Sequence, residues 1–164
     1  MSANTFKAPW GRTLCWMSAF SVVLVLAVTA PLLFKVKPES RWLVTALLLL
    51  LPVAALFVVR SYAIEFDELL IRRLLWTTHL PLAKLQSAEA VPDAMRGSLR
   101  LFGNGGMFSI TGLFRNRALG NYRAFVTDLK KTVVLRFPKR TVVVSPENPE
   151  QFVAEISSFA RCHS

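Results

Sequence analysis

Cysteine and histidine are scarce in this sequence, with two of each among 164 residues. Cys15 lies near the N-terminus and Cys162 lies close to the C-terminus. A disulfide framework needs several cysteines, and a structural metal site needs three or four clustered ligands. We therefore expect two free thiols that are far apart, no metal and no cofactor.

Residues suited to catalysis are also sparse. A nucleophile needs a base within reach, but His79 is expected at a strand end and His163 lies beside the C-terminus. Three neighbouring acidic residues are best explained by a solvated turn: Glu65, Asp67 and Glu68. The stretch 103–106 (GNGG) is expected to be a hairpin turn, because it lacks the Lys and Ser or Thr of a phosphate-binding loop. The sequence predicts no enzyme, and a membrane-bound hydrolase is the least favoured alternative.

Charge is absent from two long stretches near the N-terminus. Residues 14–34 and 42–59 contain no charged side chain, and the loop between them, 35–41, carries three basic residues and one acidic residue. As helices, which rise about 1.5 Å per residue, these stretches would span roughly 31 and 27 Å, close to a hydrocarbon core of about 30 Å. Lipid favours helices because backbone polar groups must be paired within the segment. The sequence therefore predicts a transmembrane helical hairpin over 14–59, preceded by a tail over 1–13.

Processing and orientation leave alternatives open. A basic start followed by an apolar run is also typical of a signal peptide, but this run exceeds the usual length of about 7–15 residues. Pro31 would also directly follow a cut after Ala30, so an uncleaved helix is expected. Basic residues are slightly more numerous beside the hairpin ends than in its loop. We expect a multi-pass protein of the bacterial inner membrane with both termini in the cytoplasm.

The overall charge indicates the kind of partner. The chain is 53% hydrophobic with a net charge of +10, and from residue 60 onward 15 basic residues face nine acidic ones. A basic domain tethered to a bilayer is attracted to anionic headgroups. Nucleic acid is the other usual partner of a basic chain. The sequence contains no nucleic-acid-binding motif, so we do not expect nucleic acid to bind.

Beyond residue 60 the pattern changes to short apolar segments separated by turns. Alternation over 62–66, followed by the apolar stretch 69–78, indicates a hairpin around the acidic turn, and Leu80–Pro81 is expected to end its second strand. Further strands are predicted within 83–91, 99–102, 107–116, 122–127, 132–137 and 141–145, with Gly112 marking a bulge or bend. Asn148–Pro149 then predicts the start of a helix over about 149–161. Its apolar face is formed by Phe152, Ile156, Phe159 and Ala160.

The segment 60–164 thus contains about seven short strands and a C-terminal helix, and it resembles the bacterial pleckstrin-homology (PH-like) domain families found behind membrane hairpins. The stretches that carry the resemblance are PLAKLQSAE (81–89), RLFGNGG (100–106), LGNYRAFVTD (119–128) and VSPENPEQF (144–152). The resemblance implies a mainly β domain of two nearly orthogonal sheets, with one end closed by the helix. It also implies a non-catalytic binding scaffold on a membrane anchor.

Basic residues are the best candidates for ligand contact. Several lie at predicted strand ends, where hairpin loops would gather them on one rim: Arg115, Arg117, Arg123, Lys130, Lys131, Arg136, Lys139 and Arg140. Arginine binds phosphate in bidentate fashion and lysine offers a point charge. The expected partners are anionic lipid headgroups or an unidentified membrane or cytoplasmic protein. The alternative is a solvated basic surface with no specific partner.

The small residues of the first apolar stretch support a second hypothesis. They permit close approach of another helix: Ala19, Ser21, Ala27 and Ala30. The chain would then be a structural subunit of a larger membrane complex, with the hairpin as its interface.

Overall fold

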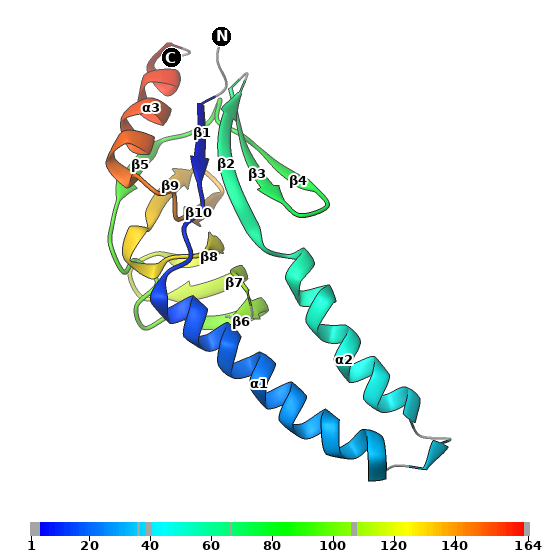
Figure 1. Ribbon diagram of the computed structural model, residues 1–164. Coiled ribbons are helices and arrows are strands. Elements are labelled where there is room, and N and C mark those ends of the chain that lie inside the picture. Colours follow the sequence, from blue (N-terminus) through cyan, green and yellow to red (C-terminus); the bar gives the residue numbers. More distant parts are fainter. Residues whose placement is uncertain (1–3, 36, 39–40, 66, 106–107, 163–164) are drawn as a thin grey trace.

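The computed structural model describes residues 4–35, 37–38, 41–65, 67–105 and 108–162 of the chain, which form a β-domain with a pair of long helices projecting from one side (Figure 1). In chain order the elements are β1 (Asn4–Lys7), α1 (Arg12–Lys35), α2 (Arg41–Leu56), β2 (Val59–Glu65), β3 (Glu68–Arg73), β4 (Thr77–Pro81), β5 (Ser87–Ala90), β6 (Leu99–Gly105), β7 (Ile110–Asn116), β8 (Gly120–Val126), η2 (Leu129–Lys131), β9 (Val133–Phe137), β10 (Arg140–Val144) and α3 (Pro149–Cys162).

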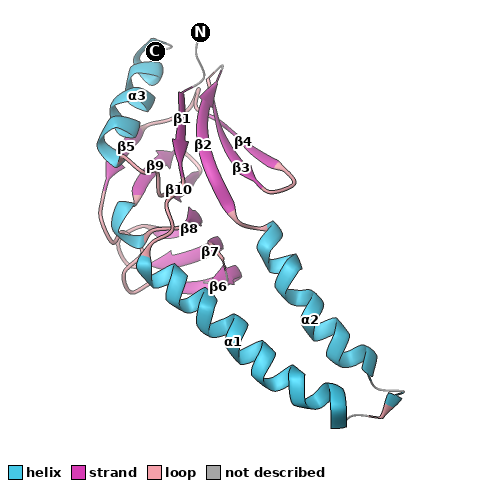
Figure 2. Cartoon of the chain, viewed as in Figure 1, coloured by secondary structure: helices cyan, strands magenta, loops and turns pink. Residues whose placement is uncertain are grey.

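The strands form two sheets (Figure 2). One sheet has four strands in the order β1-β2-β3-β4, and the other has six in the order β5-β9-β10-β8-β7-β6. All pairs are antiparallel except β8 and β10, which run parallel. The expectation of a mainly β domain with two sheets and a C-terminal helix is confirmed.

The main core lies between the two sheets and is closed by α3. Phe152 and Ile156 of α3 are fully buried in it, as the helical periodicity predicts, whereas the side chains of Phe159 and Ala160 lie outside the described part. Tyr62 of β2 joins the sheets, because its hydroxyl donates to the carbonyl of Phe125 at 2.6 Å and accepts the N–H of Ser145 at 3.2 Å. Burial raises the pKa of Tyr62 to about 12.

A second core covers the other face of the six-stranded sheet, and the first turn of α1 is part of it. Leu14 is buried there with Tyr122, Val126 and Val143. The membrane-hairpin interpretation of residues 14–34 places Leu14 in lipid, but the structure places it in protein. The difference arises because the chain is still bonded to the domain where α1 begins: the Gly11 N–H donates to the carbonyl of Thr127, directly after β8, at 2.9 Å.

The sequence predicts a tail over residues 1–13, but part of this segment belongs to a sheet. Residues 4–7 form β1, which pairs antiparallel with β2 from Asn4 opposite Ile64 to Lys7 opposite Ser61. Phe6 is buried, and its ring meets that of Phe152 edge-on at 5.1 Å. Thr5 and Lys7 are exposed whereas Phe6 and Ala8 are buried; this alternation is a strand signal too short to stand out in the sequence.

The estimate of about seven strands is too low, because the described residues between 59 and 144 form nine strands, β2 to β10. The apolar stretch 69–78 folds back on itself, since the Arg73 N–H donates to the carbonyl of Trp76 at 3.0 Å and separates β3 from β4. The strand that follows this turn, β4, ends at Pro81, as the sequence predicts, and proline is tolerated there because β4 is an edge strand. The expected turn at 103–106 is also displaced, because β6 continues to Gly105.

Gly112 allows an unusually close approach of β6 and β7. A Cβ atom added at Gly112 would lie 2.8 Å from the Cα of Gly103, and its φ of +145° is a conformation that side-chain-bearing residues rarely adopt. The predicted bend at Gly112 is therefore a point of backbone contact between two strands.

The second helix is shorter than predicted. The apolar stretch 42–59 extends past the helix, because α2 ends at Leu56 and Val59 already pairs with Arg73 in the β2–β3 ladder. By length and composition, α1 is apolar enough to cross a membrane, and α2 is a shorter apolar helix of 16 residues.

Candidate functional site

We call α1 and α2 together the helix pair. Direct hydrogen bonds join the helix pair to the β-domain. The N–H of Phe108, in the turn between β6 and β7, donates to the Ser18 hydroxyl of α1 at 2.9 Å. The Ser109 hydroxyl donates to the carbonyl of Phe57, just past α2, at 3.1 Å. Phe57 also packs edge-on against Trp76, with ring centroids 5.1 Å apart. Both helices are therefore fixed to the domain, α1 near its start and α2 just after its end.

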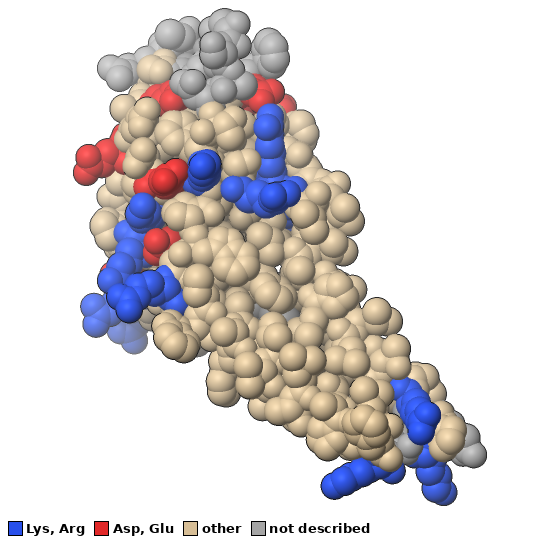
Figure 3. Space-filling model, viewed as in Figure 1, with Lys and Arg blue, Asp and Glu red and all other residues tan. Residues whose placement is uncertain are grey.

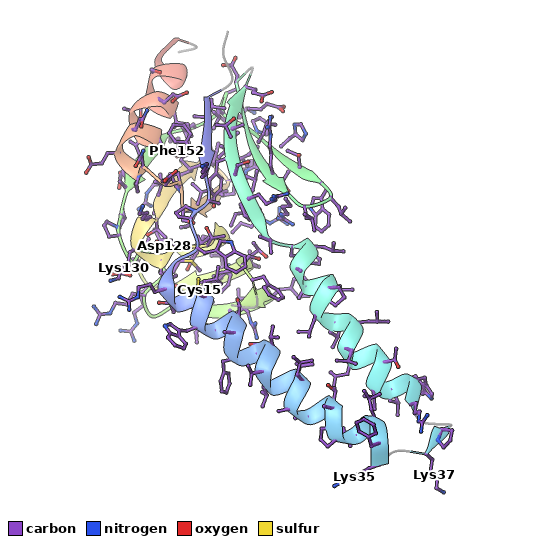
Figure 4. All side chains as sticks on the ribbon, viewed as in Figure 1. Cys15, Lys35, Lys37, Asp128, Lys130 and Phe152 are labelled. Atoms are coloured by element: carbon purple, nitrogen blue, oxygen red, sulfur yellow. The ribbon has the colours of Figure 1, made fainter. Side chains whose placement is uncertain are left out.

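Beyond the junction, the helix pair leaves its apolar side chains uncovered. Only four of its residues are buried: Leu14, Ser18, Thr29 and Val44. Figure 3 shows an unbroken uncharged surface between the β-domain and the tip of the pair, where basic side chains reappear. Lys35 and Lys37 mark this tip in Figure 4.

The eight predicted basic site residues do not form a single rim. Strand register places five of them at one end of the six-stranded sheet, because β7 and β9 end where β8 and β10 begin. We call this group the basic strand end: Arg115, Arg117, Arg136, Lys139 and Arg140. Arg140 also stacks over the Phe137 ring at 5.2 Å. No signal in the sequence places β10 beside β8, although that pairing unites the group.

Lys130 and Lys131 lie at the opposite end of the sheet, in the η2 turn between β8 and β9. The ammonium of Lys131 donates to the Glu147 carbonyl at 2.9 Å, so it helps to hold the chain before α3. Lys130, labelled beside Asp128 in Figure 4, lines a groove of about 480 Å³ together with Asn148 and Glu150. Because this groove carries both signs of charge, it does not select an anion.

Arg123 lies apart from both groups and faces an arginine that sequence reasoning missed. Arg73, at the end of β3, stacks its guanidinium over Trp76 at 5.4 Å and over Phe125 at 5.2 Å. Arg123 is two residues before Phe125 on the same face of β8. Burial, followed by the repulsion of Arg123, lowers the pKa of Arg73. The Arg73 Nε is buried without a hydrogen-bond partner. A half-buried arginine, Arg73, and an exposed one, Arg123, are therefore close enough to repel each other beside the helix junction.

The acidic residues and histidines of the described part of the chain include two that form separate pairs. Glu65 pairs with Arg72 at 2.7 Å, and Glu68 contacts the exposed His79 ring at 2.8 Å. Among the described residues, no three His, Cys, Asp or Glu side chains come together. Cys15 is free and exposed, whereas His163 and the side chain of Cys162 lie outside the described part.

Comparison with known proteins identifies the domain. A family profile described as "Bacterial PH domain" matches residues 60–159, more than half of the chain. The chain belongs to the bacterial PH domain family. No curated protein and no solved structure matches it. PH domains are typically non-catalytic binding modules, and the resemblance found in the sequence is confirmed.

Proposed function

We propose that the chain is a non-catalytic binding module whose PH domain is held at the inner face of the bacterial inner membrane by a transmembrane hairpin, α1 and α2. The observation that carries the proposal is the uncovered apolar surface of the helix pair beyond a base that is built into the domain. Exposing such a surface to water is costly, whereas lipid accepts it. Residues 60–164, together with β1 and the first turn of α1, then form the binding domain.

The ends of the helix pair suit the two surfaces of a bilayer. Trp16 and Trp76 are exposed near the domain, and Trp42 is exposed near the tip; indole rings favour the membrane interface. Lys35, Lys37 and the arginine at position 41 place positive charge beyond the tip. In this arrangement both chain termini stay with the PH domain on one side of the membrane (Figure 1).

The basic strand end supplies the binding surface in this proposal. Its residues come from neighbouring strands, and Arg100 of β6 joins them because it lies opposite Phe114, next to Arg115 on β7. The guanidinium groups of such arginines can bind phosphate oxygens in bidentate fashion. We propose anionic lipid headgroups as the ligand, with an acidic face of a membrane or cytoplasmic protein as the alternative.

Membrane insertion is tested with the full chain in native membranes. The protein is expected to stay in the pellet after carbonate extraction, and replacing Leu24 and Leu49 together with arginine is expected to release it. Both positions are exposed on the helix pair, so the substitution leaves the domain core intact. Release of the unaltered chain by carbonate would reject the hairpin.

The ligand is tested by native mass spectrometry of the full chain released gently from bacterial membranes. Phosphatidylglycerol or cardiolipin is expected to remain bound and to be lost when Arg115, Arg117 and Arg140 are changed to glutamate. The matched control changes Lys130 and Lys131, at the opposite end of the sheet, to glutamate. Equal retention in all variants would reject the basic strand end as a lipid site.

The second candidate, a structural subunit of a larger complex, is favoured by one observation. Ala19, Ala27 and Ala30 are exposed on α1, and their spacing of eight and three residues places them on one side of the helix. Replacing all three with leucine is expected to release a partner that co-purifies with the unaltered chain. No change in co-purification would remove this candidate.

A further inference from the structure

The PH domain exposes large apolar side chains on the side from which the helix pair projects. We call this surface the apolar base; it comprises Leu74, Leu75 and Trp76 of the β3–β4 turn, Leu99, Leu101 and Phe102 of β6, and Leu113 of β7. Phe102 is 81% exposed, Leu99 72% and Leu75 70%, values unusual for side chains of this kind on a domain with two well-filled cores. Figure 1 shows the β3–β4 turn and β6 beside the upper ends of α1 and α2.

Contacts at the junction fix the level of this surface along the helix pair. Trp76 packs on Phe57, the residue directly after α2. The turn that follows β6 is hydrogen-bonded to Ser18, two turns into α1. The apolar base therefore borders the point at which the helices leave the domain.

Beyond this point the helix pair is slightly shorter than the hydrocarbon core of a typical bilayer. From residue 19 to the end of α1 at Lys35 there are 17 residues, and α2 has 16. At about 1.5 Å per residue these lengths are roughly 25 and 24 Å, against a hydrocarbon core of about 30 Å. Tilt reduces the span further, and a helix shorter than the hydrocarbon core thins the bilayer around it, which brings the membrane interface toward the apolar base.

Arginines border the apolar base and make it suitable for an anionic surface. Arg100 lies between Leu99 and Leu101 on β6, and Arg115 lies directly opposite Leu99. Arg73 precedes Leu74, and its guanidinium stacks over Trp76. On such a surface the apolar side chains can be buried among the lipid acyl chains, while the arginines at its border are attracted to the headgroup phosphates.

We propose that the apolar base lies in the interfacial region of the same bilayer and gives the PH domain a second membrane contact, formed by the domain itself. This inference rests on the proposed hairpin and adds apolar surface at the point where the hairpin leaves the domain. The contact is shallow, because β6 is an edge strand whose unpaired backbone groups need water or headgroups and not hydrocarbon. The hairpin and the apolar base together hold the domain in one fixed orientation on the membrane.

The test uses the full chain in vesicles of phosphatidylcholine and phosphatidylglycerol, with both native cysteines replaced by serine. An environment-sensitive fluorophore is attached to a single new cysteine in each of four variants: Phe102→Cys, Leu75→Cys, Leu49→Cys and Glu89→Cys. Leu49 reports on the hairpin, and Glu89 is the matched control because it is exposed on β5, the opposite edge strand of the same sheet. Lipids brominated near the headgroup or near the chain end serve as quenchers of known depth.

The labels at Phe102 and Leu75 are expected to be quenched mainly by bromine near the headgroup, the Leu49 label mainly by deep bromine, and the Glu89 label by neither. If only the Leu49 label is quenched, the second contact is wrong and the hairpin stands. If no label is quenched, the hairpin itself is wrong. A blue-shifted Phe102 label that bromine does not quench would overturn the inference in favour of contact with a second copy of the chain.

Discussion

Replacing Leu14 with alanine tests whether α1 and the PH domain are one folding unit. Leu14 belongs to the uncharged stretch that sequence reasoning assigns to lipid, yet it is only 2% exposed and packs in the second core. If the structure is correct, shortening this side chain destabilises the β-domain, although the substitution lies in α1. If Leu14 faced lipid, the domain would not respond.

The magnitude follows from the burial. Removing the outer carbons of a fully buried leucine loses their transfer free energy and leaves a cavity, at a total cost of about 2–5 kcal/mol. For a chain of this size each kcal/mol lowers the melting temperature by about 2–4 °C, so a fall of roughly 10 °C is expected. The matched control is Leu24→Ala on the same helix, which is half exposed and should cost about 0.5 kcal/mol or less.

The measurement is protease resistance of the β-domain in detergent-solubilised full chain over a temperature ramp, followed with an antibody to a C-terminal tag. The Leu14→Ala protein should lose resistance at a clearly lower temperature than the Leu24→Ala protein. Coinciding curves for the two variants would refute the conclusion that α1 contributes to the domain core. A comparable loss in the Leu24→Ala protein would do the same, because the effect would then be general to the helix.

Three further outcomes are expected. Burial raises the pKa of Tyr62 from 10.0 to about 12, so its contribution to stability is complete below pH 10 and is lost as the pH rises to 12. The free energy of unfolding, measured with urea, should therefore fall by about 3 kcal/mol over this pH range. The fall should be absent in the Tyr62→Phe variant, and an unchanged fall in that variant would contradict its assignment to Tyr62. Gly112→Ala should destabilise the chain by more than about 1 kcal/mol in the same assay, since its Cβ would meet the backbone of β6; a neutral effect would refute the close approach. Intact mass of the protein from membranes should include residues 1–30, because Phe6 lies in the core, whereas a mass matching a start at Pro31 would establish cleavage.

Much of the domain was readable from the sequence because its cues are local. Asn148–Pro149 marked the start of α3, and the spacing of Phe152 and Ile156 marked its buried face. Gly112 marked a place where a side chain does not fit. The order of short strands carried the resemblance to PH domains, which the family match confirms. The basic character of the domain was likewise a matter of composition.

The candidate site was less readable because it depends on pairing between distant segments. Arg115 and Arg140 are 25 residues apart in the chain and share a strand end because β8 and β10 run parallel. Lys130 and Lys131 also lie between two predicted strands, so the sequence groups them with these arginines. The structure places them in η2, at the opposite end of the six-stranded sheet. Arg73 was missed because its role depends on two aromatic rings, one of them on the opposite sheet.

The sequence by itself determined that two uncharged stretches precede a basic, strand-rich domain with a terminal helix. These features follow from side-chain polarity and its period, which any short window of the chain displays. Tertiary structure alone decided that residues 4–7 complete a sheet with β2 and that Leu14 belongs to a protein core. It also decided which arginines meet. Such outcomes depend on which distant segments pair and which faces they bury, and no local pattern of polarity contains that information.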